Sequence, residues 1–324
     1  MKTYRIPHTD LVVSRLGYGC MGLGGAWDRT PYSPADQAKA ASLIAAALEQ
    51  GMNFFDHADI YTYGKAEAVF GAVLGGSPGL RQKLVLQSKC GIRFADDPVA
   101  GMPGRYDFSY AHITASVEGS LSRLQTDYLD LLLLHRPDPL VEPEEVARAF
   151  DELQQAGKVR YFGVSNHNPD QIELLRRYVR QPLVVNQVEL NLLHAGLIRD
   201  GFLVNQDANR YSGAGGILDY CRRNEILVQA WAPVANGRLI NPPAEADTNI
   251  LCAAAEIAKL AEQKHTSREA IALAWLLRHP AGIQPIVGTT NLGRLQASCA
   301  ADTVELSREE WYRLLVSAQG FEMP

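Results

Sequence analysis

The sequence has few cysteines, no long hydrophobic run and no cluster of basic residues, and each absence excludes a class of protein. Its five cysteines are an odd number without a Cys-x-x-Cys pair, which argues against a disulfide framework and a structural zinc site. The longest uninterrupted apolar run, Ala270 to Leu277, is too short to span a bilayer. With 31 basic against 36 acidic residues, the net charge of −5 offers no electrostatic footprint for nucleic acid.

The N-terminus also lacks the apolar stretch of a secretion signal, because MKTYRIPHTD carries charges and a proline there. The remaining composition is ordinary: 47% of the residues are hydrophobic and 21% are charged, as in globular chains with a substantial core. We therefore expect a folded cytoplasmic protein, with neither nucleic acid nor membrane as a partner. The sequence leaves open whether it forms a homo-oligomer.

A β-strand pattern followed by an amphipathic helix pattern recurs along the chain. Helix starts are marked by Ser33-Pro34, Ser109, Pro143 and Asn168-Pro169, and glycines such as Gly51 and Gly157 mark helix ends. The eight candidate strands are 16–20, 53–55, 84–87, 129–134, 162–164, 184–188, 227–231 and 286–287.

Eight such units predict a closed (β/α)₈ barrel, the TIM barrel, with a parallel eight-stranded sheet. The runs LDLLLLH and QPLVVNQVEL are apolar nearly throughout, as expected for strands covered on both faces. No linker or composition shift divides the chain, so we expect one domain over residues 1–324. Two long connections, 92–108 and 205–216, follow the third and sixth strands, where barrel loops shape the active face, although the second is equally explained as a tolerated insertion.

The segment from Gly17 to Gly22 matches the Gly-x-Gly-x-x-Gly fingerprint of a Rossmann dinucleotide site. That site needs a helix N-terminus directly after the glycines to hold the pyrophosphate. Here LGGAWDRTPYSPAD follows, with glycines and prolines that disfavour a helix. We interpret the match as accidental.

Four ionisable residues lie at or just beyond the predicted strand ends: Asp56, Tyr61, Lys89 and His135. Each residue alone has an ordinary structural explanation, but together the four can form a site that donates a proton. A lysine ammonium beside a tyrosine stabilises the phenolate and lowers the phenol pKa from its usual value near ~10. In this hypothesis Asp56 holds Lys89 protonated, and His135 hydrogen-bonds the oxygen that receives the proton.

Seven separated blocks carry a resemblance that covers nearly the whole chain: FFDHADIY, VLQSKCGI, LDLLLLHRPDPL, VRYFGVSNHNP, NQVELN, QAWAP and PIVGTTNLGRL. In this order and spacing they resemble the aldo-keto reductase superfamily, most closely a bacterial branch of predicted oxidoreductases. The resemblance implies a (β/α)₈ barrel that binds NADPH in an extended pose and reduces an aldehyde or ketone to an alcohol. It also implies that Asp56, Tyr61, Lys89 and His135 are the catalytic tetrad.

The resemblance further implies contacts to the nicotinamide, from Ser165, Asn166 and Gln187 to its carboxamide and from Trp231 stacking on its ring. The flat face of Trp231 suits this role, although the family more often has a tyrosine there. Further cofactor contacts are implied after the first strand, beside the tetrad and along the pyrophosphate: Cys20, Met21, Asp56, Ala232, Pro233, Val234, Gly237 and Arg238.

The segment Gly288, Thr289, Thr290 and Arg294 resembles the one that receives the adenosine 2′-phosphate, with a helix beginning near Leu292. We therefore expect NADPH over NADH. Gly288 stands where many relatives have a lysine, and Ala297 and Ser298 replace polar adenine contacts, which leaves the strength of this preference open. We still expect Ser298 to contact the cofactor.

The predicted substrate-binding residues are Trp27, Phe94, Tyr61 and His135, and Tyr63 and Tyr106 are further candidates for an aromatic pocket wall. Two other functions stay open: a cofactor-binding auxiliary subunit with little turnover on the same scaffold, and, less favoured, a metal-dependent hydrolase. The eight histidines show no metal-ligand spacing, so no metal site is expected. The sequence does not disclose the physiological substrate.

Overall fold

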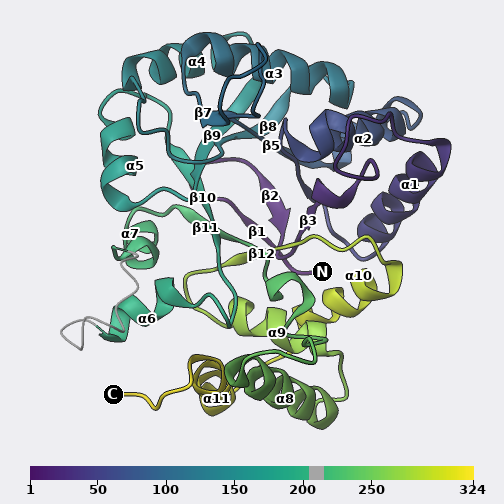
Figure 1. Cartoon of the computed structure of the whole chain (residues 1–324), viewed down its shortest axis with the longest axis vertical. Helices are drawn as coiled ribbons and strands as arrows, with labels where there is room; N and C mark the ends of the chain where they lie inside the picture. The colour runs from purple at the N-terminus through teal and green to yellow at the C-terminus, as the bar shows by residue number, and fades with distance from the viewer. Residues whose placement is uncertain (204–214) are drawn as a thin grey trace.

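The computed structural model describes residues 1–203 and 215–324, and in them a closed barrel of parallel strands is surrounded by helices (Figure 1). The prediction of an eight-stranded (β/α)₈ barrel is confirmed, with strand bounds shifted by a few residues. The barrel strands, in the order in which they are hydrogen-bonded, are β10 (Leu183–Glu189), β11 (Leu227–Trp231), β12 (Gln284–Val287), β3 (Gly17–Gly19), β4 (Phe54–Asp56), β5 (Val85–Cys90), β8 (Leu129–Leu134) and β9 (Val159–Ser165).

The helices begin where the sequence predicted. Ser33 and Asn168 cap their helices with reciprocal side-chain and backbone hydrogen bonds, and Ser109 caps a third. Gly51 and Gly157 follow helix ends with positive φ, which glycine adopts without steric cost. The helices that surround the barrel are α1 (Pro34–Glu49), α2 (Lys65–Gly75), α3 (Tyr110–Leu124), α4 (Pro143–Gln155), α5 (Pro169–Arg176), α7 (Ile217–Arg223), α9 (Arg268–Leu277) and α10 (Leu292–Cys299).

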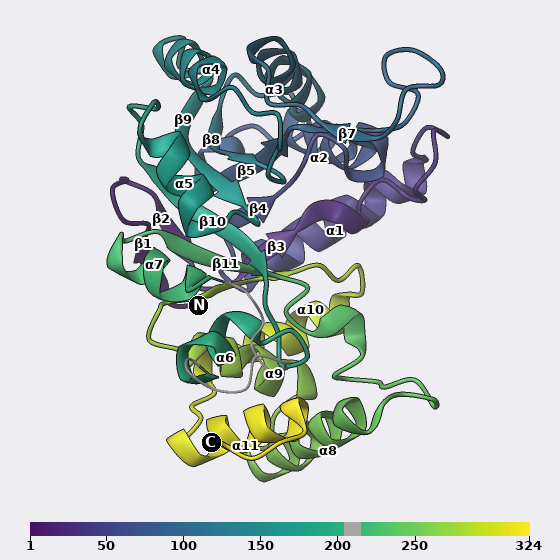
Figure 2. The ribbon, with the colours of Figure 1, turned by 60° about the vertical axis from the view of Figure 1, so that its left-hand side comes forward.

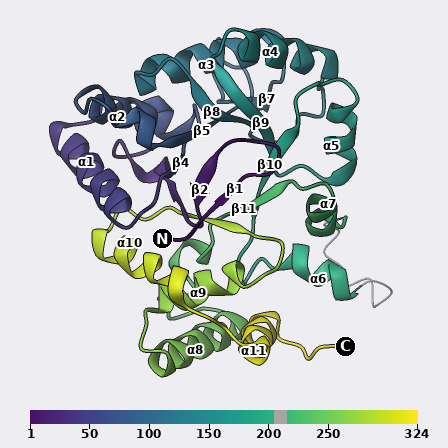
Figure 3. The same cartoon turned by 180° about the vertical axis from the view of Figure 1, so that it is seen from behind.

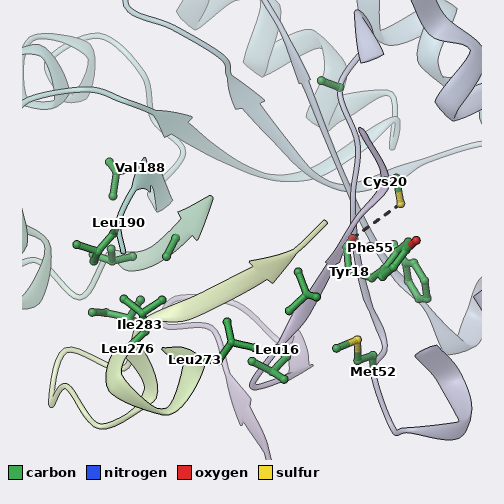
Figure 4. Close-up of a cluster of buried hydrophobic side chains, with 14 of the residues drawn as sticks. Leu16, Tyr18, Cys20, Met52, Phe55, Val188, Leu190, Leu273, Leu276 and Ile283 are labelled. Carbon is green, nitrogen blue, oxygen red and sulfur yellow. Dashed lines mark hydrogen bonds between the residues drawn. The ribbon is translucent and has the colours of Figure 1, made fainter. Parts of the chain in front are cut away.

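Two hydrophobic layers hold the barrel together. The outer layer lies between strands and helices, where Leu273 and Leu276 of α9 share one cluster with Leu16 and Ile283 (Figure 4). The inner layer fills the inside of the barrel. It consists of the buried side chains Ile6, Leu11, Val13, Phe54, Val85, Leu131, Leu133, Val184, Val185, Leu227 and Ile286.

An antiparallel hairpin of β1 (Thr3–Arg5) and β2 (Val12–Ser14) supplies part of this inner layer. Figure 3 shows it lying across the barrel strands when the molecule is seen from behind. The sequence pattern does not predict this hairpin, because strands of three residues are too short to show a period. It covers the barrel at the amino ends of the strands, where Ser14 bonds to Gln284 and Asn53, so a site can open only at the carboxyl ends.

The glycines of the apparent dinucleotide fingerprint serve packing. Gly17 and Gly19 belong to β3, and a Cβ on Gly17 would lie 2.7 Å from Ile286 Cδ1 of the neighbouring strand. Only a short turn, η1 (Cys20–Gly22), follows, and the next α-helix begins at Pro34. The interpretation of the match as accidental is confirmed.

The remaining elements belong neither to the barrel strands nor to the helices that surround them. The predicted loop 92–108 contains a small hairpin of β6 (Ile92–Arg93) and β7 (Arg105–Tyr106), while residues 205–214 of the second predicted connection lie outside the described residues.

Helices α8 (Thr248–Gln263) and α11 (Arg308–Gln319) lie side by side, with α9 between them and the barrel (Figure 2). The other described elements are α6 (Gly196–Leu203), η2 (Tyr61–Gly64), η3 (Arg81–Lys83), η5 (Ala235–Gly237) and η6 (Ala300–Thr303). No helix in the described ranges has the length and apolarity to cross a membrane.

Candidate active site

The four predicted catalytic residues meet at the carboxyl end of the barrel. Asp56 ends β4, Lys89 lies within β5, His135 directly follows β8, and Tyr61 begins η2. Side chains alternate across a strand, so every second residue of these strands points into the barrel. The fold therefore brings together residues that lie up to 79 positions apart in the sequence, 135 − 56.

The Lys89 ammonium is the centre of this group. Its Nζ atom lies 2.8 Å from Asp56 Oδ2, 2.9 Å from Tyr61 Oη and 2.9 Å from the carbonyl oxygen of His57. Lys89 is fully buried, and Asp56 is 2% exposed. A buried ammonium needs an acceptor for each of its three hydrogens, and here it has all three.

The protonation states follow from these contacts. Burial disfavours the ammonium, but Asp56 and Tyr61 outweigh it and raise the pKa of Lys89. Burial also raises the pKa of the Tyr61 phenol above its ordinary value, although Lys89 acts in the opposite direction. The expectation of a net lowered pKa for Tyr61 is therefore wrong for the free chain, because the loss of hydration outweighs the lysine charge. Tyr61 consequently keeps its proton at neutral pH.

His135 faces Tyr61 across the site, with ring centroids 5.9 Å apart and planes 78° apart. Burial, together with the charges of Lys89 and Arg136, holds the pKa of His135 well below its ordinary value. The imidazole is therefore neutral and can donate one hydrogen bond. His57 takes no part in this contact, because its buried ring packs edge-on against Phe70 with centroids 4.6 Å apart.

A chain of buried glutamine amides supports Asp56 from inside the barrel. Gln87 and Gln187 donate to Asp56 Oδ1 at 2.6 and 3.1 Å. Both also donate to Gln229 Oε1 at 2.9 Å, and Gln229 donates to Gln284 Oε1 at 2.9 Å. Gln284 finally donates to the carbonyl oxygen of Ser14 in β2 at 2.8 Å. The carboxylate is thus connected by hydrogen bonds to the hairpin that closes the far end of the barrel.

A cleft of about 770 Å³ opens above the tetrad. Lys89 lies beneath the cleft and does not line it. Of the other predicted site residues, three stay outside its lining: Cys20, Phe94 and Arg238. The remaining ones share it: Met21, Trp27, Asp56, Tyr61, His135, Ser165, Asn166, Gln187, Trp231, Ala232, Pro233, Val234, Gly237, Gly288, Thr289, Thr290, Arg294 and Ser298.

Cys20 and Phe94 have other surroundings. Cys20 is fully buried in the outer hydrophobic layer, where its thiol lies 3.8 Å from the carbonyl oxygen of Tyr18 (Figure 4). Phe94 stacks on Tyr63 with ring centroids 4.5 Å apart, and Trp27 packs edge-on against Tyr63 at 6.3 Å. Phe94 therefore belongs to an aromatic cluster at the rim, of which Trp27 alone reaches the cleft lining.

The residues predicted for the nicotinamide are hydrogen-bonded to one another. Ser165 Oγ donates to the carbonyl oxygen of Gln187 at 2.8 Å, and Asn166 Nδ2 donates to Ser165 Oγ at 2.7 Å. Trp231 Nε1 donates to Asn166 Oδ1 at 3.1 Å, so the indole fixes the amide as well as offering a flat face. The fold therefore orients this group of side chains without a ligand.

The loop after Trp231 has an unusual backbone. Ala232, Ala235 and Asn236 all have positive φ, a left-handed conformation that is unfavourable for residues other than glycine. Such strain persists only where the surroundings impose it, and it gathers at functional sites. Thr62 and Tyr63, directly after Tyr61, share this feature.

The opposite end of the cleft is more open. Gly288 is exposed, and a Cβ there would meet nothing within 4 Å. Asn291 caps α10 by accepting a hydrogen bond from the backbone N–H of Arg294 at 3.0 Å, whereas the exposed Arg294 guanidinium has no ion pair within the described part of the chain. Ser298 donates its hydroxyl hydrogen to the carbonyl oxygen of Arg294 at 2.8 Å.

The cleft lining includes residues that sequence reasoning missed. Arg136 is the clearest case, because it directly follows His135 in the block LDLLLLHRPDPL and could have been found there. Ile60, Ile92, Ile286 and Val287 also lie in the quoted blocks, but their apolar side chains look like ordinary packing residues. The missed residues are Gly19, Ile60, Ile92, Arg136, Asn236, Ile240, Asn241, Glu269, Leu273, Ile286, Val287 and Asn291. Among the described residues no group of three His, Cys, Asp or Glu could hold a metal ion.

Comparison with known proteins agrees with this geometry. The model of the aldo/keto reductase family matches residues 15–315. An uncharacterized oxidoreductase of Bacillus subtilis, YcsN, is 38% identical over 316 residues, 97% of each chain. A 6-dehydroglucose reductase of Agrobacterium fabrum is 36% identical over 321 residues, 98% of this chain and 99% of the relative.

A solved structure extends the similarity to three dimensions. The aldo/keto reductase from Klebsiella pneumoniae, in complex with NADP and acetate, has a TM-score of 0.71 and 26% identity, covering 94% of this chain and 90% of its own. The family match, the relatives that align over their whole length and the barrel structure all indicate the same family. The chain therefore belongs to the aldo/keto reductase family of oxidoreductases.

Proposed function

We propose that this protein reduces an aldehyde or ketone to an alcohol with NADPH, and that Tyr61 is its proton donor. The observation that carries the proposal is the Lys89 ammonium, which is fully buried and shared between Asp56 and the Tyr61 hydroxyl at the base of the cleft. A surface lysine would not need such partners. In this proposal the Tyr61 hydroxyl supplies the proton, and the adjacent Lys89 ammonium compensates the negative charge that remains on the phenolate.

Each residue has a distinct part in the proposed reaction. The neutral His135 donates a hydrogen bond to the carbonyl oxygen and orients it. When bound, NADPH supplies the hydride that adds to the carbonyl carbon. Tyr61 then gives its proton to the oxygen, and Lys89 stabilises the phenolate that remains. The high pKa of Tyr61 keeps the proton in place beforehand, and an alkoxide is basic enough to remove it.

The fit of the cofactor rests on features of the cleft itself. Trp231 presents a flat ring in the same cleft as Tyr61, and Ala232 and Asn236, which have positive φ, line the cleft after it. The exposed Arg294 beside the start of α10 suits the adenosine 2′-phosphate, since guanidinium groups and helix N-termini both bind phosphate. The solved Klebsiella pneumoniae relative contains NADP, which supports the same assignment. Gln187 can bind the nicotinamide carboxamide only as an acceptor, through its side-chain oxygen, because both N–H groups of its amide donate to Asp56 and Gln229.

The test is NADPH oxidation, followed at 340 nm, with a panel of aldehydes, diketones and quinones. Wild-type protein is expected to turn over at least one of them, and Tyr61→Phe is expected to lose roughly 10²–10⁴-fold in kcat while still binding NADPH. Tyr128→Phe, which also loses one hydroxyl but whose ring stacks on Arg81 outside the cleft lining, is the matched control.

Two results would contradict the proposal. Nearly full activity in Tyr61→Phe would show that the proton comes from another group. NADPH binding without turnover of any carbonyl compound by wild-type protein would instead favour the auxiliary-subunit function.

A further inference from the structure

Arg136 places a positive charge in the wall of the cleft beside the catalytic residues. It directly follows His135 and lines the same cleft as Tyr61. Its guanidinium carbon lies 5.5 Å from the centre of the Trp231 ring, a cation–π contact. Two elements on different sides of the site, the end of β8 and the end of β11, therefore hold this side chain in position.

The Arg136 guanidinium has no anionic partner among the residues that the structure describes. No ion pair or hydrogen bond joins it to another described side chain, and its cation–π contact is with the ring of Trp231. Glu189, which the β10–β11 register places beside Trp231, forms no ion pair with it. Stacking on an aromatic ring leaves the N–H edges of a guanidinium free, and these edges match the two oxygens of a carboxylate.

The other groups around Arg136 leave its charge uncompensated. Asp56 and Lys89 neutralise each other in their buried pair, and His135 is uncharged. The other charged side chains of the cleft lining, Glu269 and Arg294, belong to α9 and α10, and neither forms an ion pair with Arg136 in the part of the chain that the structure describes. A partly buried arginine is costly to leave unpaired, so its place at the reacting end implies an anion supplied from outside.

We propose that Arg136 is an oxyanion subsite for the substrate, and that the preferred substrates are carbonyl compounds carrying a carboxylate or a comparable acidic group. This inference rests on the proposed carbonyl reduction and names the class of compound that it acts on. The carbonyl group lies at Tyr61 and His135, while the acidic group, at the other end of the same molecule, accepts two N–H bonds from Arg136. Trp231 positions the guanidinium and takes no proton.

Two isosteric aldehydes test the subsite: 4-formylbenzoate, which is anionic, and 4-formylbenzamide, which is neutral. In wild-type protein kcat/KM is expected to favour the anion. In Arg136→Met the ratio of the two kcat/KM values is expected to fall about ten-fold or more, mainly through KM for the anion, because a charge-assisted hydrogen bond is lost. Arg136→Lys is expected to give an intermediate ratio, since lysine keeps the positive charge but lacks the planar pair of N–H donors.

Binding without turnover provides a second readout. The dissociation constant of 4-methylbenzoate, measured by calorimetry on protein loaded with NADP⁺, is expected to rise about ten-fold in Arg136→Met. The matched control is Arg148→Met. Arg148 also stacks on an aromatic ring, with its guanidinium carbon 3.8 Å from the Tyr110 ring centre, but it lies on α4 and pairs with Glu152.

The possible results distinguish a failure of the Arg136 subsite from a failure of the proposed carbonyl reduction. If both aldehydes are reduced equally well and Arg136→Met leaves their ratio unchanged, the subsite is wrong and carbonyl reduction stands. If neither aldehyde nor any carbonyl compound of the wider panel is reduced but 4-methylbenzoate binding depends on Arg136, the subsite stands and the proposed reaction falls. If Arg136→Met raises KM for NADPH alone, Arg136 binds a cofactor phosphate and the subsite is wrong.

Discussion

The two ends of the cleft differ in how their polar groups are held. At the reacting end Lys89 and Asp56 are buried and bonded to each other, and Gln229 links the amides that support Asp56. At the other end Arg294 is exposed, and its guanidinium has no ion pair within the described residues. The fold itself orients the reacting groups, whereas the far end can be ordered by its ligand.

Solvation explains the difference. A buried charge without a partner costs several kcal/mol, so the fold has to supply partners for Lys89 before any ligand arrives. An exposed guanidinium costs little, because water solvates it. Preorganisation is valuable at the reacting end, where dipoles aimed at a developing charge need not reorient during the reaction. Substitutions at the two ends should therefore differ in what they change and by how much.

The largest effect is expected from Lys89→Met. The substitution leaves Asp56 as a buried carboxylate without a cation, which should lower the free energy of unfolding by about 3–5 kcal/mol. Carbonyl reduction should fall by roughly 10³-fold or more, because the phenolate of Tyr61 loses its counter-charge. Urea unfolding followed by circular dichroism and the 340 nm assay measure the two effects.

The pH dependence of the Lys89→Met variant sharpens this prediction. Its unpaired Asp56 should bind a proton in the folded state more readily than in the unfolded state, so stability should be greater at pH 5 and fall as the pH rises toward 8. Lys158→Met, which breaks an exposed pair with Glu118, is the control and should cost at most about 1 kcal/mol. Equal losses in the two variants would remove the distinction between buried and exposed charge.

A smaller effect is expected from Gln229→Leu. Gln229 accepts hydrogen bonds from the two amides that donate to Asp56, so its loss should let the carboxylate and Lys89 shift. We expect kcat to fall by about ten-fold with little change in KM for NADPH, together with roughly 1–3 kcal/mol of lost stability. Gln284→Leu is the matched control, because it removes a buried amide one step farther from Asp56.

The two glutamine variants separate positioning from general stability. Gln284→Leu should cost similar stability but less than three-fold in kcat, since Gln87 and Gln187 still have Gln229 as a partner. A kcat loss that simply follows the stability loss in both variants would argue that the amide chain does not position Asp56. Measuring kcat well below each unfolding temperature makes this comparison valid.

Much of the barrel could be predicted from the sequence, because apolar strands and capped helices are local patterns. The strand 129–134 and the capping of α1 by Ser33 were both read from neighbouring residues. The convergence of Asp56, Lys89 and His135 could be predicted for a related reason, because parallel strands end at the same face of the barrel.

What was missed depends on contacts between distant residues. Gln87 and Gln229 lie in the quoted blocks VLQSKCGI and QAWAP, and Gln284 begins a strand, but no local pattern shows that the three form one hydrogen-bonded chain in the barrel. The sign of the Tyr61 pKa shift was predicted wrongly because the depth of burial cannot be read from sequence. Cys20 was expected at the cofactor and instead packs in the outer hydrophobic layer, since it begins η1 with its side chain turned away from the cleft lining.

The smallest effect is expected at the open end of the cleft, from Arg294→Ala. The side chain makes no ion pair within the described residues, so the free energy of unfolding should change by less than about 0.5 kcal/mol. KM for NADPH should rise about five- to ten-fold through loss of a contact to the 2′-phosphate. NADH lacks this phosphate and is the internal control, so its KM should stay nearly unchanged. Equal increases for the two cofactors would assign Arg294 to a part that they share, and a large loss of stability would show that this end, like the tetrad, is held by the fold rather than by its ligand.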